Sequence, residues 1–115
     1  MEHILIIDNE EGVLECLRRV LSHLGYEVKV ARSGKEGIEL FDRDDDLDLV
    51  ITEISLPGKN GNEVASYIRN SCRANTPVVA MIGLDESAVH KDLFNVSFMK
   101  PFRMQSLIEA IRSLS

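Results

Sequence analysis

Tryptophan is absent from this 115-residue chain, and aromatic residues make up only 5% of it. An excess of positive charge is absent too. Thirteen Lys and Arg stand against 19 Asp and Glu, which gives a formal net charge of -6 at pH 7. Because phosphate backbones are bound by clustered Lys and Arg, this balance argues against direct nucleic-acid binding by the chain. DNA binding by a further domain outside the chain stays open.

Long apolar runs are also missing, since no stretch approaches the roughly 18 residues of a membrane-spanning helix. The N-terminal stretch "MEHILIIDNE" reaches acidic residues at once and lacks a basic segment before an apolar one, so it does not predict a signal peptide. The two cysteines, Cys16 and Cys72, lie far apart and match no metal-ligand spacing. We therefore expect reduced, packing cysteines in a cytoplasmic protein that does not contact membranes.

The remaining composition suits a folded domain. Hydrophobic residues make up 44% of the chain, which is enough for one core, and the length favours a single domain over residues 1–115. No low-complexity linker or internal repeat interrupts it. The chain stops at the end of its last predicted helix, where a linker to an output domain would start. A stand-alone protein and a piece of a longer one are both open.

Short apolar runs alternate with helical patterns along the whole chain. In "EGVLECLRRVLSHLG" the apolar residues recur at spacings of three and four, which is typical of one helix face, and Gly25 is expected to cap that helix at its C-terminus. Ser33 and Glu36 have the capping-box spacing that opens a second helix. Further helices are predicted around "NEVASYIRNSC", over 85–94 as a short element, and at "SLIEAIRSL". Strands are predicted at 3–7, 26–31, 47–52, 76–82 and 96–99.

This alternation predicts an α/β fold with a parallel sheet covered on both faces. At this length the common arrangement is the flavodoxin-like (βα)5 doubly wound sandwich, with five strands in the order 2-1-3-4-5. Ligands of such folds bind beyond the carboxyl ends of the strands, where the winding reverses. In this order the reversal lies between the first and third strands.

Polar residues stand where several of the predicted strands end. Taken singly, each has a structural explanation, because an acid after a strand often caps the next helix and a lysine is usually a surface residue. Together they predict one cleft that uses acids and a lysine. The residues expected at this edge are Asp8, Asn9, Glu10, Glu53, Ile82, Gly83, Lys100 and Pro101.

Four segments in this order resemble the receiver domain of bacterial two-component response regulators. They are "ILIIDNEEGVLECLRRVL", "DLVITEISLPGKNG", "TPVVAMIGLDE" and "FMKPF", and the resemblance covers essentially the whole chain. It implies a signalling module rather than an enzyme. It also implies protein partners, namely a sensor kinase or an output domain, that bind through the region of strands and helices 4 to 5.

The resemblance also assigns roles to the residues of the cleft. In the family, an aspartate at the position of Glu53 accepts a phosphoryl group from the kinase. A magnesium ion held by acids of strands 1 and 3, here Asp8 and Glu53, neutralises the phosphoryl oxygens. A lysine, here Lys100, contacts one of those oxygens. The resemblance implies a cis peptide bond between Lys100 and Pro101.

The sequence departs from the family pattern at four of these positions. The direct magnesium ligand is replaced by the neutral Asn9, and the acceptor aspartate by the longer Glu53. Glu10 is an alternative source of the missing acid. The hydroxyl that contacts the phosphoryl group is replaced by Ile82, and the aromatic switch residue by Ser97. Phe98 is expected to point to the other face of its strand, into the core.

These departures affect metal binding, phosphoryl transfer and switching together. A misplacement of about 1 Å can cost on the order of 100-fold in rate, so we expect negligible transfer to Glu53 and magnesium binding that is weak or absent. Glu53 is then either a fixed negative charge near Lys100 or an acid without a signalling role. Two other functions stay open: an atypical magnesium-dependent phospho-acceptor, and a small-ligand module on the same fold. No glycine-rich phosphate loop follows the first strand, which argues against the last.

Overall fold

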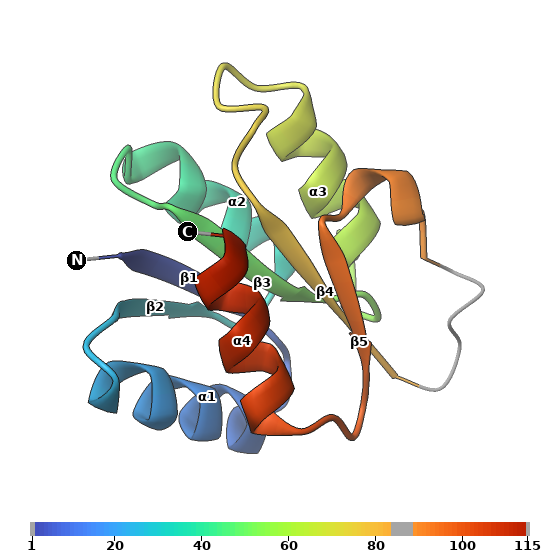
Figure 1. The fold of residues 1–115 in the computed structure, drawn as a ribbon. Helices are drawn as coiled ribbons and strands as arrows, with labels where there is room; N and C mark the ends of the chain where they lie inside the picture. Colours follow the sequence, from blue (N-terminus) through green and yellow to red (C-terminus); the bar gives the residue numbers. More distant parts are fainter. Residues whose placement is uncertain (1, 84–88, 115) are drawn as a thin grey trace.

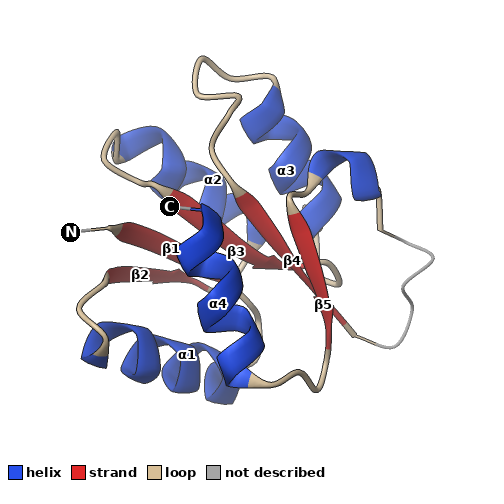
Figure 2. Cartoon of the chain, in the orientation of Figure 1, coloured by secondary structure: helices blue, strands red, loops and turns tan. Residues whose placement is uncertain are grey.

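The structure, a computed structural model, describes residues 2–83 and 89–114 (Figure 1). Strands and helices alternate along these residues, as the sequence predicts (Figure 2). In chain order the elements are β1 (His3–Ile7), α1 (Glu11–His23), β2 (Glu27–Ala31), α2 (Gly34–Arg43), β3 (Leu49–Glu53), α3 (Gly61–Arg69), β4 (Val78–Ile82), η2 (a 3₁₀ helix, Lys91–Leu93), β5 (Val96–Met99) and α4 (Met104–Leu114). No helix in the described ranges combines the length and the apolar character needed to cross a membrane.

The five strands form one parallel sheet in the order β2-β1-β3-β4-β5, which confirms the predicted topology. The central strands are apolar along most of their length, and every residue of β3 and β4 is buried. Such continuous burial is expected of parallel strands that helices cover on both sides. The order places β1 beside β3, with Ile6 paired to Ile51, so that their carboxyl ends are neighbours.

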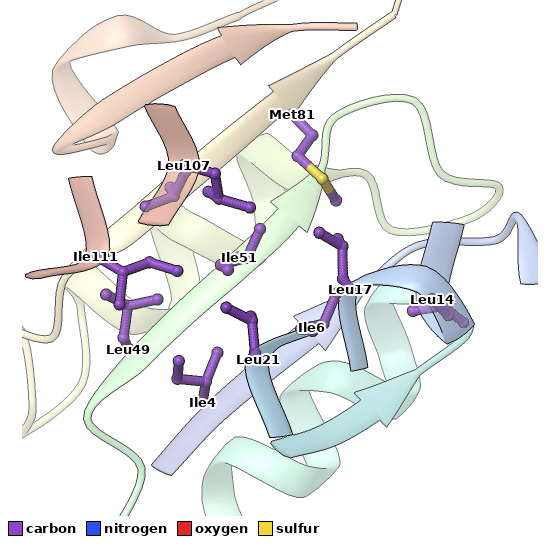
Figure 3. Packing of buried hydrophobic residues seen from close by; sticks show 11 residues of the cluster. Ile4, Ile6, Leu14, Leu17, Leu21, Leu49, Ile51, Met81, Leu107 and Ile111 are labelled. Carbon is purple, nitrogen blue, oxygen red and sulfur yellow. The ribbon is translucent and has the colours of Figure 1, made fainter. Parts of the chain in front are cut away.

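Two layers of helices cover the sheet. α1 and α4 lie on one face, and α2 and α3 lie on the other (Figure 1). The core on the α1 and α4 side is built from alternate strand residues and from the apolar stripes of the two helices (Figure 3). Its buried members are Ile4, Ile6, Leu14, Leu17, Leu21, Leu49, Ile51, Val79, Met81, Leu107 and Ile111.

The predicted helix ends are confirmed at two points. Gly25 follows the last turn of α1 with φ +101°, a left-handed conformation that glycine adopts without a steric penalty. Ser33 caps α2, because its hydroxyl accepts a hydrogen bond from the Glu36 amide. The Glu36 carboxylate reaches back one residue further than in a capping box and accepts from the amide of Arg32.

The connection from β4 to β5 is described only in its second half. The sequence predicts a short helix over 85–94, but the described part of this connection forms a single 3₁₀ turn at Lys91–Leu93, and residues 84–88 lie outside the described ranges. Arg69 fixes the turn from α3, since it donates to the carbonyl oxygens of Leu93 and Thr76 and to Asn95 Oδ1. A side chain of α3 therefore holds the described part of this connection in place.

Candidate functional site

Three charged side chains predicted to converge do meet at the carboxyl edge of the sheet. Asp8 directly follows β1, and its amide donates to the Ala31 carbonyl at 3.1 Å, which extends the β1–β2 pairing by one residue. Glu53 is the last residue of β3. Lys100 follows β5, and its amide donates to the Ile82 carbonyl at 2.7 Å. Strand ends from both halves of the sheet thus set the positions of these groups.

The Lys100 ammonium lies between the two buried acids. Its Nζ is 2.8 Å from Asp8 Oδ2 and 2.7 Å from Glu53 Oε2. A third acid, Glu10, places Oε1 at 3.3 Å from the same nitrogen. Asp8 is fully buried and Glu53 is only 4% exposed, so the lysine is the positive charge that compensates them in a poorly hydrated place.

The two contacts of Lys100 with buried acids differ in geometry. Lys100 donates a hydrogen bond to Asp8, but the angles of its contact with Glu53 Oε2 fall outside those of a hydrogen bond. The contact between Lys100 and Glu53 is therefore an ion pair that lacks a hydrogen bond. The other Glu53 oxygen, Oε1, faces Gly83, where an added Cβ would lie 3.6 Å away. The glycine leaves that side of the carboxylate open.

Burial and pairing shift the proton affinities of this cluster. Burial raises the pKa of Glu53, and the nearby charge of Asp8 adds to this, while Lys100 acts in the opposite direction without cancelling it. Burial lowers the pKa of Lys100, but its contacts with Asp8 and Glu53 outweigh burial, and the net shift is upward. The ammonium is thus held in its charged form, while Glu53 binds its proton more tightly than an ordinary glutamate.

The remaining residues of the acidic loop have unequal roles. Glu10 is the N-cap of α1, and its amide donates to Asp8 Oδ1 at 2.9 Å, which fixes the Asp8 side chain from the backbone. Asn9 is exposed. The Glu10 carboxylate makes the long contact with Lys100, and its role as a replacement acid for a metal stays a prediction.

Ile82 and Ser97 stand where the family has its hydroxyl and its aromatic switch residue. The first is buried and apolar, and the second is exposed. Ile82 is 4% exposed and packs with Ile54 and Val89 on the α3 side of the sheet. Ser97 is exposed on the edge strand β5. Phe98 turns to the opposite face and packs against the α1 and α4 core, with its ring centroid 5.6 Å from that of Phe102. The predicted orientation of Phe98 is confirmed. The peptide bond between Lys100 and Pro101 is cis, also as predicted.

The sheet order, the acid and lysine cluster and the cis bond all agree with one family. The sequence profile described as "Response regulator receiver domain" matches residues 4–112. This chain belongs to the response regulator receiver domain family.

Individual relatives support the same assignment. Response regulator MprA of Mycolicibacterium vanbaalenii is 31% identical over 115 residues, which cover 96% of this chain and 49% of that protein. Transcriptional regulatory protein CrdR of Helicobacter pylori is 29% identical, covering 95% of this chain and 53% of that protein. Response regulator protein TrrA of Thermotoga maritima, solved in complex with Mg²⁺ and BeF, has a TM-score of 0.90 at 29% identity and covers 100% of both chains. This receiver domain spans about half the length of these curated relatives.

Magnesium does not fit the donor set of this receiver domain. Asp8 Oδ2 and Glu53 Oε2 both face the Lys100 ammonium, and Asp8 Oδ1 accepts from a backbone amide. Within the described residues, no cluster of three or more His, Cys, Asp or Glu side chains is placed to hold a metal ion. Mg²⁺ requires several oxygen ligands in a near-octahedral arrangement, and oxygens that already contact an ammonium and a backbone amide do not offer one.

Two supports of the site were not predicted from the sequence. Gly61 opens α3 directly against β3, so that an added Cβ would collide with the carbonyl oxygen of Glu53. Asn62 is 7% exposed, and its Oδ1 accepts from the amide of His90, which ties α3 to the β4–β5 connection. The segment "GKNGNE" contains the signals for both, a glycine and a polar residue just inside a helix start. The sequence gives no indication of which backbone they meet.

Proposed function

We propose that this receiver domain signals without phosphorylation and acts through protein–protein contacts. The observation that carries the proposal is the ion pair between Lys100 and Glu53, with Nζ and Oε2 2.7 Å apart. In the family the lysine contacts the phosphoryl group. Here Glu53 of the same chain already pairs with Lys100. The positive charge of the lysine is therefore compensated without any phosphoryl group.

The acceptor oxygen is also poorly placed for attack on phosphorus. A nucleophilic carboxylate has to be ionised and exposed to its donor. Glu53 is 4% exposed, and burial raises its pKa. Attack would require Glu53 to leave Lys100, and this would leave a buried carboxylate without its ion pair. The ion pair therefore opposes phosphoryl transfer and keeps the domain in one state.

The switch side of the site supports the same proposal. A phosphoryl group would normally pull the end of β4 inward through a hydroxyl. Ile82 has none and is packed in an apolar cluster with Ile54 and Val89. Ser97 has no aromatic ring to move between an inward and an outward position. The fixed state is the only one that these side chains support.

The partner surface is proposed on the same grounds. We place it at β4, β5 and α4 together with the η2 turn, because Lys100 follows β5 and two of the changed positions, Ile82 and Ser97, lie on β4 and β5. The relatives are about twice as long as this chain, and two are named as regulators, one of them transcriptional. An output domain or a sensor kinase is the class of partner that this implies, with no direct role for nucleic acid at this domain.

The deciding experiment is incubation with acetyl phosphate and magnesium, read by intact mass. We expect no mass increase at any magnesium concentration in the titration. The Glu53→Gln variant is the matched control, because it keeps the size of the side chain and removes the carboxylate. A phosphorylated species that forms with Glu53 and disappears in Glu53→Gln would overturn the proposal and identify a working, atypical phospho-acceptor.

A further inference from the structure

A polar hollow lies at the amino ends of β4 and β5, at the opposite edge of the sheet from Lys100 and Glu53. It has a volume of about 280 Å³, just below the roughly 300–1,000 Å³ of pockets for drug-sized ligands, so it suits a smaller molecule. Its walls come from the end of α3, from the turn before β4 and from the connection that leads through η2 into β5. The residues that line it are Arg69, Ala74, Asn75, Asp92, Phe94 and Asn95.

Arg69 brings a positive charge to this hollow, and its own partners are neutral. It donates to three carbonyl oxygens and to Asn95 Oδ1. Burial lowers the pKa of the guanidinium, and among the described residues no acid opposes this. A guanidinium has five N–H donors, so one N–H of Nη2 remains after these bonds. The bond from Nη2 to Asn95 is exposed, which places the remaining donor on the solvent side, where an oxyanion can reach it.

Two side-chain amides line the hollow together with this guanidinium. Asn95 Oδ1 accepts from the Val78 amide and from Arg69 Nη2, both at 2.9 Å. These two bonds fix the orientation of the Asn95 side chain and leave its Nδ2 group as a donor. Asn75 is exposed and contributes the second amide. The guanidinium and the two amides therefore offer N–H donors to a single carboxylate group.

The acid that lines the hollow, Asp92 on η2, decides which kind of carboxylate fits. Asp92 is exposed, and no ion pair joins it to Arg69 within residues 2–83 and 89–114. A plain anion such as phosphate would be repelled by this carboxylate. A ligand with an ammonium group beside its own carboxylate satisfies both charges of the hollow. In a free α-amino acid these two groups are attached to the same carbon atom.

The remaining lining residues, Ala74 and Phe94, are apolar. Phe94 is partly buried and packs against the apolar clusters on the α2 and α3 side of the sheet. Its position in the wall of the hollow gives an aliphatic side chain of the ligand a surface to pack against. Each lining residue thus has a counterpart in one small molecule.

We propose that this hollow binds a free α-amino acid with an aliphatic side chain. The carboxylate of the ligand accepts from Arg69, Asn75 and Asn95. Its ammonium group donates to Asp92, and its side chain contacts Phe94. The bound molecule would bridge α3 and η2, and it would therefore hold the β4–β5 connection. The site itself does not depend on the proposed absence of phosphorylation.

Two-dimensional NMR titration of the chain with L-leucine tests the proposal. We expect saturable shifts at the side-chain amides of Asn75 and Asn95 and at the backbone amides of η2. Isocaproate lacks the ammonium group of leucine and isoamylamine lacks its carboxylate, so each should bind at least about ten-fold more weakly. Absence of saturable shifts with L-leucine, or equal binding of either analogue, would overturn the proposal.

Substitution of the exposed lining residues tests the assigned contacts. Asp92→Asn should weaken binding of L-leucine by at least about ten-fold and leave binding of isocaproate no weaker, because only the ammonium group loses its partner. Asn75→Ala should weaken L-leucine and isocaproate alike. Glu109→Gln is the matched control, since it removes the same charge from an exposed position on α4, on the other face of the sheet, and should leave binding unchanged (Figure 1). Melting temperatures without ligand show whether each variant is folded. A folded Asp92→Asn variant that binds L-leucine as the native chain does would overturn the proposal.

Discussion

Lys100 and Glu53 come from distant parts of the sequence, yet their Nζ and Oε2 atoms lie 2.7 Å apart at the carboxyl edge of the sheet. The two side chains are 19% and 5% exposed, so the pair is largely withdrawn from water. Charges in such a place are stable only while each has its partner. Removing or protonating one partner should therefore change the stability of the whole domain.

Replacing Lys100 with methionine should destabilise the domain by roughly 3–5 kcal/mol at pH 7, because Asp8 and Glu53 would remain buried without a cation. Urea denaturation measures the loss. The control is Lys29→Met, since Lys29 pairs with Asp44 at 2.7 Å but is 50% exposed. We expect that variant to lose at most about 1 kcal/mol. Equal losses in the two variants would contradict a special role of the buried cluster.

The free energy of unfolding should depend on pH in part through the protonation of Glu53. Burial raises the pKa of its carboxyl in the folded state above its value in the unfolded chain, so the folded chain binds this proton more tightly. The contribution of Glu53 to stability is therefore fully present below the unfolded pKa, and it falls as pH rises through the folded pKa.

Comparison with Glu53→Gln isolates this effect from the other carboxyl groups. Urea denaturation at intervals from about pH 4.5 to about pH 8 gives the unfolding free energy of both proteins. As pH rises, the native chain should lose stability relative to the variant. A shift in the opposite direction would mean that the ion pair with Lys100 outweighs burial.

Phosphorylation should not return with a single substitution. Glu53→Asp restores the family's acceptor, but Asn9 and Ile82 still leave the site without a metal ligand and a hydroxyl. We expect no mass increase with acetyl phosphate and magnesium for this variant. The triple variant Asn9→Asp, Glu53→Asp, Ile82→Thr should gain the mass of one phosphoryl group, with Glu53→Asn in place of Glu53→Asp as its control. Phosphorylation of the single variant would show that the acceptor alone limits the chemistry.

Arg69 should be the main support of the β4–β5 connection. It donates hydrogen bonds to the carbonyl oxygens of Leu93, Ala74 and Thr76 and to Asn95 Oδ1 at 2.7–3.1 Å. Arg69→Met leaves these acceptors without the donor, and we expect a loss of about 3 kcal/mol and faster amide exchange at η2. Arg43→Met is the control, because Arg43 is exposed and bonds to the carbonyl of its own helix. Unchanged exchange at η2 would contradict this role.

Two glycines beside Glu53 should respond differently to an added methyl group. Gly61→Ala forces a collision with the Glu53 carbonyl and should cost about 1–3 kcal/mol. Gly83→Ala places its Cβ at an ordinary 3.6 Å from Glu53 Oε1 and should change stability by less than about 0.5 kcal/mol. Thermal unfolding compares the two. Similar melting temperatures would mean that the start of α3 shifts away from β3 at little cost.

Local patterns determined most of the architecture. Continuous apolar runs specified the strands, and spacings of three and four specified the helices, because each pattern depends only on which face of an element is buried. Right-handed crossovers left few topologies, and the structure confirms the one that is common at this length, with strand order 2-1-3-4-5. The strand-end positions of Asp8, Glu53 and Lys100 followed directly. Of the short helix predicted over 85–94, the described part is the 3₁₀ helix Lys91–Leu93, and Arg69 of α3 holds it through a distant contact that no local pattern records.

The sequence by itself determined that an acid of β3 and the lysine after β5 share one edge of the sheet. Only the tertiary structure decided that Glu53 turns toward Lys100, that Asp8 contacts the same ammonium, and that Glu10 adds a third, longer contact. It also decided that Gly61 packs against the backbone of Glu53. The reason is physical: strand order fixes where a backbone ends to within a few ångströms, whereas a side-chain pairing depends on rotamers, burial and neighbouring charges that are set only when all the elements are packed.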